Sequence, residues 1–375
     1  MAAAITVLLG PPATGASASA PSTSAPGAPP PAKAELLADL DTGRVLVEQN
    51  DHTPLPPASL TKILTAVVAA DWLPSDSQVP VSAAAANVAP DKLGMKAGQV
   101  WPFDITMHAL LISSSNDAAY ALGELVSGSL ANFPQTMSYA AQQMGMRDHP
   151  LLRDPAGLDG TEGVDGGNLM SAWDIAVAAR DLMANPYLAS IVAEKSFRFT
   201  GPDGIVYEIA SHNRAFLNSY PGATGVKTGY TDPAGVCIAA SAERGGRHLL
   251  AVVMNGEFPD RTAEMLLDQG FATAPQTEPL TDPMLPPVLE PHPPAPAAKH
   301  NPARGGTPVP PTEGYPGVGA DRLAAVGGKP SRGTEVMPAA LAAACLVTLL
   351  ACAGTLVARG RRRQRENGLH YRRRG

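Results

Sequence analysis

The stretch PPASLTKILTAV, residues 56–67, places a hydroxyl and an ammonium group one helical turn apart at the head of an apolar run. Apolar side chains recur at helical spacing from Leu60 to Val67, which predicts a helix. Residues i and i+3 share one helix face, so Ser59 and Lys62 are expected within hydrogen-bond reach. The free N–H groups of a helix N-terminus favour negative charge beside Ser59. A capping serine next to a solvated lysine is the plain alternative.

A second polar cluster lies in LLISSSNDAAYALGE, residues 110–124. An apolar run delivers Ser114 and Asn116 to the point where an Ala-rich helix resumes. These side chains are candidates for the same site as Ser59, although an ordinary helix cap at Asn116 or Asp117 is the alternative.

A third cluster lies in GATGVKTGYTDPAG, residues 222–235, which reads as an edge strand entering a loop. An ammonium at Lys227 and a hydroxyl at Thr228 suit a substrate carboxylate. Gly229 would let the backbone of a peptide substrate lie alongside the strand. The alternative is a solvated lysine beside a turn.

The pattern of strands and helices predicts an α+β fold. Residues 35–50 alternate and read as a β-hairpin, and the segments flanking Arg244 to Arg247 read as another hairpin near the other end of the domain. Strands at both ends with helices between them predict one antiparallel sheet into which a helical region is inserted. One helix is expected to start at Ser59. Further helices are expected over residues 109–121, 123–127, 132–144, 171–183 and 260–269.

Charge and cysteine content exclude several classes of protein. The formal net charge is −6, but residues 359–375 carry eight arginines and one glutamate, so residues 1–358 sum to −13. An acidic body argues against a nucleic-acid partner. Cys237, Cys345 and Cys352 form no metal-binding spacing, and no metal is expected. Cys237 is expected to be a small buried side chain.

The two ends of the chain suggest export and anchoring. Residues 1–32 resemble a signal peptide with a Pro/Ser/Ala-rich leader, although a basic n-region is missing and a disordered leader is the alternative. One folded domain is expected over residues 33–273, followed by a Pro-rich disordered stalk over 274–336. Residues 337–358 contain no charge and are long enough for a transmembrane helix, with a buried core helix as the alternative. The basic tail, 359–375, is then cytoplasmic and the domain extracellular.

Together and in this order, the three motifs resemble those of penicillin-binding proteins and class A β-lactamases. Through its flanks PASLTK, SSNDAA and GVKTGYT, the chain resembles a low-molecular-mass penicillin-binding protein of the serine-type D-alanyl-D-alanine carboxypeptidase family. The resemblance covers residues 33–273 and implies the β-lactamase/transpeptidase-like fold, an α/β/α sandwich.

The resemblance also implies roles for the site residues. Ser59 would attack the bond between two D-alanines of a peptidoglycan stem peptide, and a neutral Lys62 would accept its proton. Ser114 would relay the proton to the leaving group. The substrate-binding residues implied are Asn116 for the peptide groups, Lys227 and Thr228 for the terminal carboxylate, Gly229 at the close approach, and the N–H groups of Ser59 and Tyr230 for the oxyanion. No cofactor is implied, and β-lactams should acylate Ser59.

The sequence departs from the family pattern at two positions. Ser115 stands where a glycine is common, and only a local adjustment is expected. Asp154, in RDPAGLDG, stands where an asparagine is usual, which leaves the hydrogen bonding of that loop open. Glu162 follows without the Glu-x-x-Leu-Asn pattern of class A β-lactamases. A β-lactamase, a transpeptidase or endopeptidase on the same scaffold, and a non-catalytic wall-binding module are the other readings.

Overall fold

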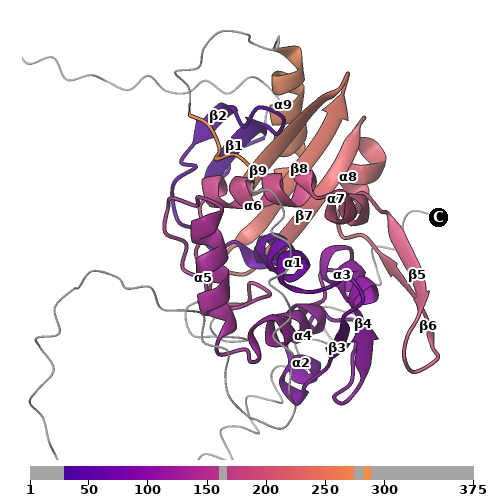
Figure 1. Cartoon of the computed structure of the whole chain (residues 1–375). Coiled ribbons are helices and arrows are strands. Elements are labelled where there is room, and N and C mark those ends of the chain that lie inside the picture. The colour runs from indigo at the N-terminus through magenta and orange to yellow at the C-terminus, as the bar shows by residue number, and fades with distance from the viewer. Residues whose placement is uncertain (1–28, 160–166, 274–282, 289–375) are drawn as a thin grey trace, which may run out of the picture. The chain divides into compact units, whose positions relative to one another are not determined.

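The computed structural model describes residues 29–159, 167–273 and 283–288, and a five-stranded antiparallel sheet forms its centre. The strand order is β2-β1-β9-β8-β7 (Figure 1), so both ends of the domain contribute to one sheet. The predicted sheet and its inserted helical region are therefore confirmed. The strands of this sheet are β1 (Ala34–Asp39), β2 (Val45–Gln49), β7 (Ala223–Thr231), β8 (Gly235–Arg244) and β9 (Arg247–Gly256).

The segments between β2 and β7 are helices and two small hairpins. The helices here are η1 (Ala58–Leu60), α1 (Thr61–Trp72), α2 (Ala83–Asn87), α3 (Phe103–Leu111), α4 (Asn116–Ser127), α5 (Phe133–Gln143), α6 (Ala172–Ala184), α7 (Pro186–Val192) and α8 (Arg214–Ser219). The hairpins pair β3 (Gln78–Pro80) with β4 (Val100–Pro102) and β5 (Ser196–Thr200) with β6 (Val206–Ala210). After β9, α9 (Pro259–Ala272) follows.

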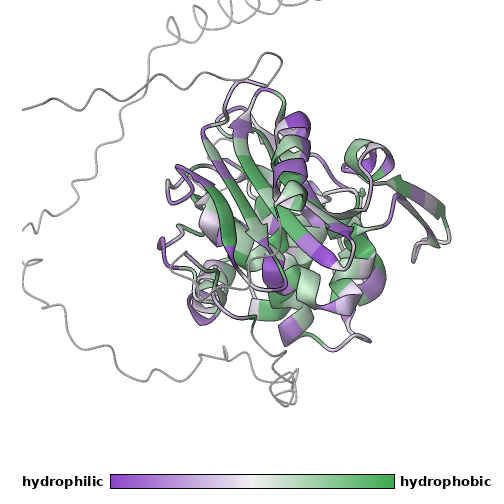
Figure 2. Cartoon of the chain, turned by 90° about the horizontal axis from the view of Figure 1, so that it is seen from above, coloured by the Kyte–Doolittle hydropathy of each residue, from purple (hydrophilic) through white to green (hydrophobic). Residues whose placement is uncertain are grey.

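The sheet is buried on both faces, because alternate side chains along each strand enter two different cores. Leu36 of β1 packs with the helical region, whereas its neighbour Leu37 packs with α8 and α9. The same alternation separates Val252 from Val253 in β9. Hydrophobic residues accordingly dominate the central strands (Figure 2). This arrangement is the predicted sandwich of helices on both faces of a sheet.

Helix α1 lies at the centre of the helical region, between α6, which packs on the sheet, and helices α3 and α4 (Figure 1). Its residues from Thr61 to Ala69 are all buried, including the polar Thr61, Lys62 and Thr65, so α1 is enclosed around its whole circumference. The N-terminus of α1 points toward β7 through the short helix η1. The core thus fixes the position of the segment that carries Ser59 and Lys62.

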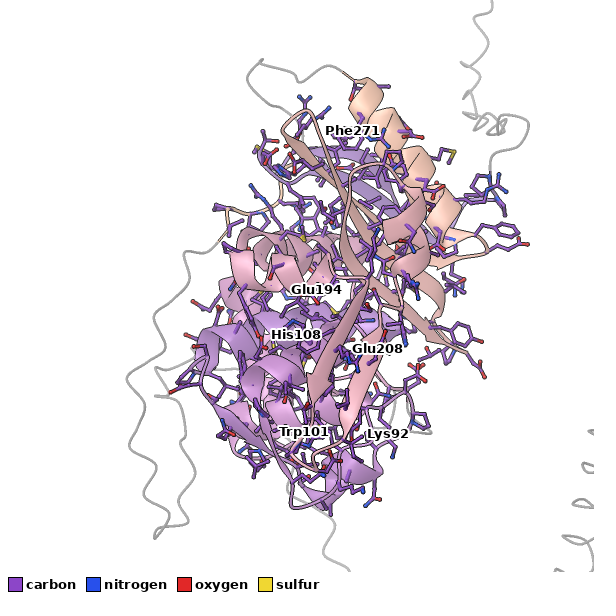
Figure 3. The ribbon with its side chains drawn as sticks, turned by 90° about the vertical axis from the view of Figure 1, so that its right-hand side faces the viewer. Lys92, Trp101, His108, Glu194, Glu208 and Phe271 are labelled. Atoms are coloured by element: carbon purple, nitrogen blue, oxygen red, sulfur yellow. The ribbon has the colours of Figure 1, made fainter. Side chains whose placement is uncertain are left out.

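The β5–β6 hairpin is attached to the helical region by aromatic contacts. Trp101 of β4 is fully buried, and its ring centroid lies 5.7 Å from that of Tyr207. His108 of α3 stacks on Phe197 at 3.8 Å, and its Nε2 lies 3.5 Å from a carboxylate oxygen of Glu194. Figure 3 shows Trp101, His108 and Glu194 along this side of the molecule.

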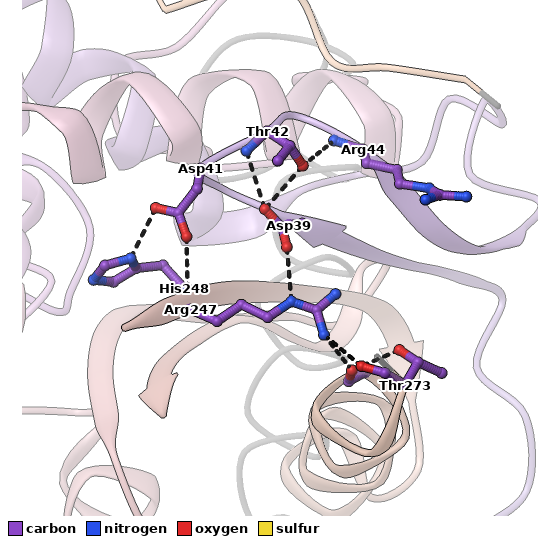
Figure 4. Close-up of polar contacts among 8 residues, drawn as sticks. Asp39, Asp41, Thr42, Arg44, Arg247, His248 and Thr273 are labelled. Atoms are coloured by element: carbon purple, nitrogen blue, oxygen red, sulfur yellow. Dashed lines mark hydrogen bonds and ion pairs between the residues drawn. The ribbon is translucent and has the colours of Figure 1, made fainter. Parts of the chain in front are cut away.

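Polar side chains connect the C-terminal end of β1 to the start of β9 (Figure 4). Asp39 accepts a hydrogen bond from Arg247 at 2.8 Å and from the Thr42 backbone N–H at 3.0 Å. Asp41 contacts the His248 ring at 2.8 Å. Arg247 also donates to the carbonyls of Gly270 and Thr273 at 2.8 and 2.9 Å, which ties the end of α9 to the sheet.

The structure corrects two predictions about local structure. Residues 109–121 were expected to form one helix, but α3 ends at Leu111 and α4 begins at Asn116. Between them, Ser114 has a φ of +59°, which no α-helix tolerates. The stalk was expected to start at residue 274, but residues 283–288 pack on the domain and bury Leu285.

Several predictions fall outside the described residues. These are the signal peptide and leader up to residue 28, Glu162, most of the stalk, the transmembrane segment 337–358 and the basic tail. Within the described residues, no helix combines the length and the apolar character that crossing a membrane requires.

Candidate active site

Ser59 lies in η1, directly before α1, at the junction between the helical region and the sheet. The preceding residue, Ala58, has a φ of +48° and is fully buried. Such a backbone conformation is costly for a residue with a side chain and is found mainly at functional sites. Gly157 packs against the carbonyl of Ala58, where a Cβ would lie 1.9 Å from that oxygen. A glycine is therefore required at position 157.

Lys62 is fully buried, and its Nζ has three oxygen neighbours. Ser59 Oγ lies at 2.8 Å, Asn116 Oδ1 at 2.7 Å and the Ala156 carbonyl at 2.9 Å. The amide and carbonyl oxygens can only accept hydrogen bonds. A neutral amine therefore spends both of its hydrogens on Asn116 and Ala156, and its lone pair faces the Ser59 hydroxyl. This geometry suits proton transfer from Ser59 to Lys62.

The surroundings of Lys62 favour its neutral form. Burial lowers the pKa of Lys62 to about 7, against the opposing effect of the carboxylates of Asp154, Asp91 and Asp117. Desolvation disfavours a charged amine, so the effect of burial has the expected sign. A substantial fraction of Lys62 is then neutral at neutral pH.

The break between α3 and α4 presents Ser114 and Asn116 to the same site. Ser114 takes its left-handed conformation because the chain must turn away from α3 before α4 begins. The Asn116 amide is fixed at both ends, since its Oδ1 accepts from Lys62 and its Nδ2 donates to the Ala89 carbonyl at 3.0 Å. Ser115 points elsewhere and contacts the Ser113 hydroxyl at 2.9 Å, so the residue replacing glycine makes only a local adjustment.

Strand β7 brings the third motif to the N-terminus of η1, and it is an edge strand of the main sheet, as predicted. Lys227 pairs with Ala239 and Gly229 with Cys237, which places both on the sheet face that meets the helical region. A Cβ at Gly229 would lie 3.0 Å from the Ser59 nitrogen. Gly229 therefore permits contact between β7 and η1, whereas the sequence suggested that it makes room for substrate.

Lys227 is a buried lysine without a carboxylate in ion-pair contact among the described residues. Its Nζ donates to the Thr228 carbonyl at 2.8 Å. Burial lowers its pKa well below the ordinary value, and the nearby charge of Lys62 acts in the same direction. A substrate carboxylate would supply the missing counter-charge.

The turn at residues 154–158 forms the floor beside Lys62. Asp154 is fully buried, and its Oδ1 accepts hydrogen bonds from the N–H groups of Ala156, Gly157 and Leu158 at 2.8, 2.6 and 2.9 Å. Its Oδ2 accepts from the Tyr120 hydroxyl at 2.5 Å. The hydrogen bonding of this loop, which the sequence left open, is therefore defined: all four groups that contact the Asp154 side chain donate to its carboxylate.

One cleft of about 350 Å³ connects these elements. It is lined by the predicted residues Ser59, Ser114, Asn116 and Tyr230. Three carboxylate-bearing residues that the sequence analysis did not single out also line it, namely Asp91, Asp159 and Asp232. The cleft is large enough for the end of a peptide and has polar groups on every side.

The structure thus brings the predicted site residues together. Ser59, Lys62 and Asn116 are joined by direct hydrogen bonds, and Gly229 touches the backbone of Ser59. Thr228 lies next to Lys227 on the edge strand, half-buried. The contribution missed was the Ala156 carbonyl, because a backbone acceptor leaves no signal in a sequence. Asp154 was singled out only for its loop, and its place beside Lys62 was not predicted.

The sequence of this chain is similar to those of known peptidases. Residues 20–257 match the profile of the peptidase S11 family, described as D-alanyl-D-alanine carboxypeptidase. The chain belongs to this family. It is similar to D-alanyl-D-alanine carboxypeptidase DacB2 of Mycobacterium tuberculosis, with 34% identity over 68% of this chain and 88% of that protein. It is 30% identical to DacF of Bacillus subtilis and spans only 64% of the length of that relative.

Solved structures of this peptidase family lead to the same assignment. A D-alanyl-D-alanine carboxypeptidase from Mycobacterium tuberculosis has a TM-score of 0.61 and 34% identity, over 67% of this chain and 96% of that one. Penicillin-binding protein D2 from Listeria monocytogenes, in an ampicillin-bound form, has a TM-score of 0.55 and 27% identity, over 64% of this chain and 97% of that one. The predicted family and fold are therefore confirmed.

Proposed function

We propose that this S11-family protein is a serine-type D-Ala-D-Ala carboxypeptidase that removes the terminal D-alanine from peptidoglycan stem peptides. The observation that carries the proposal is the 2.8 Å contact between Lys62 Nζ and Ser59 Oγ. The other two neighbours of the amine, Asn116 Oδ1 and the Ala156 carbonyl, can only accept its hydrogens. A serine hydroxyl beside a lone pair is an activated nucleophile.

The first half of the reaction forms an acyl-enzyme. Ser59 Oγ attacks the carbonyl carbon between the two D-alanines while Lys62 takes the hydroxyl proton. The backbone N–H groups of Ser59 and Tyr230 would hold the resulting oxyanion. Collapse of this intermediate breaks the C–N bond, and Ser114 passes the proton from Lys62 to the nitrogen of the departing D-alanine.

The second half regenerates the enzyme. Water attacks the ester carbonyl, Lys62 accepts a proton from that water, and the Ser59–acyl bond breaks with return of the proton to Ser59 Oγ. Lys227 and Thr228 would bind the terminal carboxylate of the substrate, because Lys227 is buried and its Nζ donates only to the Thr228 carbonyl among the described residues. Asn116 would orient the substrate peptide in addition to holding Lys62.

Penicillin labelling of the full-length protein tests this proposal. Fluorescent penicillin should form a covalent adduct with the wild-type chain and none with Ser59→Ala, while diacetyl-Lys-D-Ala-D-Ala should release free D-alanine. Rapid multiple turnover of nitrocefin would instead identify a β-lactamase. Transfer of the acyl group to an added amine would identify a transpeptidase. A folded wild-type protein that takes no label would be a non-catalytic wall-binding module.

The proposal extends to the location of the enzyme. An uncharged stretch at residues 337–358 followed by eight arginines supports a single membrane span with a cytoplasmic C-terminus and an extracellular catalytic domain. Protease added to intact spheroplasts should then digest the catalytic domain and spare an epitope tag at the C-terminus. Protection of the domain would contradict this topology.

A further inference from the structure

Asp154 is a buried carboxylate next to the reacting groups that the mechanism above does not use. It is fully buried and lies in the turn that faces α1. One oxygen accepts the three N–H groups of Ala156, Gly157 and Leu158, and the other accepts the Tyr120 hydroxyl. Four hydrogen bonds to one side chain define the turn completely.

The turn is also fastened to α1 by its carbonyl groups. Pro155 O accepts from the Thr65 hydroxyl at 2.7 Å, and Ala156 O accepts from Lys62 Nζ at 2.9 Å. Asn168 donates to Asp154 O at 2.8 Å and to the Thr61 hydroxyl at 3.1 Å. The direction of the Ala156 carbonyl therefore follows from the turn that Asp154 holds.

We propose that Asp154 is a positioning residue of this active site, which aims the Ala156 carbonyl at Lys62 and whose negative charge adjusts the base strength of that amine. The proposal rests on the proposed function. The Ala156 carbonyl takes one of the two hydrogens of the neutral amine. Loss of this acceptor would let the lone pair rotate away from Ser59.

The charge of Asp154 acts together with other groups around Lys62. Burial favours the neutral amine, while Asp154, Asp91 and Asp117 favour the charged one. His212, whose pKa is lowered by burial and by both lysines, faces the same region. Asp154 is the largest of the three opposing carboxylate effects.

The effects of Asp154 and Asp117 can be tested separately, because their carboxylates accept hydrogen bonds from different segments of the chain. Asp117 is equally buried but accepts the N–H groups of Leu93, Gly94 and Met95, which lie away from the 154–158 turn. Asparagine at position 154 would keep an oxygen for the three N–H groups and would remove the charge. Asp117→Asn removes the charge of a second carboxylate and is the comparison variant, with one acceptor oxygen left where both Asp117 oxygens accept N–H groups.

The test measures the acylation rate of the full-length protein by fluorescent penicillin from pH 5 to pH 9. We expect the acid limb of Asp154→Asn to shift toward lower pH by at least about half a unit, which is about a threefold gain in relative rate at pH 6. The plateau rate should fall, because a weaker base accepts the proton less readily. Asp117→Asn should shift the limb by less.

Several outcomes would overturn the proposal. An Asp154→Asn enzyme with a lower plateau but an unmoved acid limb would show a merely structural role, and a larger shift for Asp117→Asn would assign the effect elsewhere. If Asp154→Asn does not fold, Tyr120→Phe replaces it, since it keeps the carboxylate and removes one donor to it. Its limb should stay or move to higher pH, and a shift to lower pH contradicts the proposal. Absence of labelling in the wild type would refute the proposed function instead.

Discussion

At the scale of single residues, the reactivity of Ser59 depends on which groups around Lys62 can donate and which can only accept a hydrogen bond. Three oxygens surround one amine, and two of them cannot donate a proton. Only the Ser59 hydroxyl can donate to a neutral Lys62, so the direction of proton transfer is set by the surroundings. The same contacts would hold a charged amine in place, which leaves its protonation to decide activity.

The pH dependence of acylation follows from this protonation. Because Lys62 must be neutral to accept a proton, and its pKa is about 7, the acylation rate should rise with pH and level off above 7. Between pH 5 and pH 6 the rate should change about tenfold. Stopped-flow measurement with fluorescent penicillin checks this, with circular dichroism to confirm that the fold persists at pH 5. A flat profile over this range would show that Lys62 is not the base.

Gly229 permits a second residue-scale prediction. The Gly229→Ala variant would place a methyl group 3.0 Å from the Ser59 nitrogen, so β7 and η1 must move apart. The acylation rate should fall by about tenfold or more. Gly98→Ala is the control, since position 98 has open space around it and only a positive φ, and its acylation rate should match the wild type. Equal rates for both variants would remove the structural reason given for Gly229.

The residue scale also shows how far sequence reasoning reaches. All three motifs were identified because their side chains are chemically distinctive and their order is informative. The contact between Gly229 and η1 was not predicted, because the helix that a strand touches depends on tertiary packing. The contact between Lys62 and the Ala156 carbonyl could not be predicted, since no local pattern specifies a backbone acceptor that is 94 residues from its partner. The Tyr120 bond to Asp154 is likewise a contact between distant parts of the chain.

At the scale of elements, predictions succeeded where alternation and capping agreed. Ser171 was expected to open a helix, and its hydroxyl indeed accepts the Asp174 N–H at the start of α6. The expected helix 109–121 is broken at residues 112–115, where Ser114 has a φ of +59°, while Asp117 and the alanines that follow it are helical in α4. Helical periodicity alone does not reveal a single residue in a left-handed conformation.

The first turn of α6 makes stability depend on pH. Burial, followed by repulsion from Asp148, raises the pKa of Asp174 to about 6 from the ordinary 3.8. One of its oxygens, Oδ2, has no hydrogen-bond partner among the described residues. The folded state therefore resists ionisation of Asp174, and stability should fall as pH rises from about 4 to about 6, by up to about 3 kcal/mol.

An Asp174→Asn variant tests this effect by a double difference. The difference in unfolding free energy, variant minus wild type, should be more positive at pH 7 than at pH 4. The reason is that asparagine carries no charge at either pH, whereas Asp174 ionises between them. Urea unfolding of both proteins at both pH values measures it. Equal differences at pH 4 and pH 7 would mean that Asp174 ionises without penalty.

At the scale of the whole molecule, the two ends of the domain meet in one sheet, and the chain then returns to the same region. The sheet could be predicted because apolar strand runs near both ends of the domain are joined by the short turns Asp41-Thr42-Gly43 and Gly245-Gly246. The contact of residues 283–288 could not, because their proline content is typical of a tether. Yet Leu285 N–H donates to Gly43 O at 2.7 Å, and Pro286 O accepts from Arg180 at 2.7 Å. We name residues 283–288 the return segment.

The return segment should contribute measurably to stability, because Leu285 is almost fully buried in the main core while its neighbour Met284 is exposed. Replacing Leu285 by alanine leaves a cavity and should cost about 2 kcal/mol or more of the free energy of unfolding. The cost is limited by how firmly Arg180 holds the backbone of the segment. Met284→Ala is the matched control and should change stability by less than about 0.5 kcal/mol. Urea unfolding of the full-length variants, with limited proteolysis to detect release of the segment, measures both effects. If Leu285→Ala is as stable and as protease-resistant as Met284→Ala, the return segment is a passive neighbour of the domain rather than a part of its core.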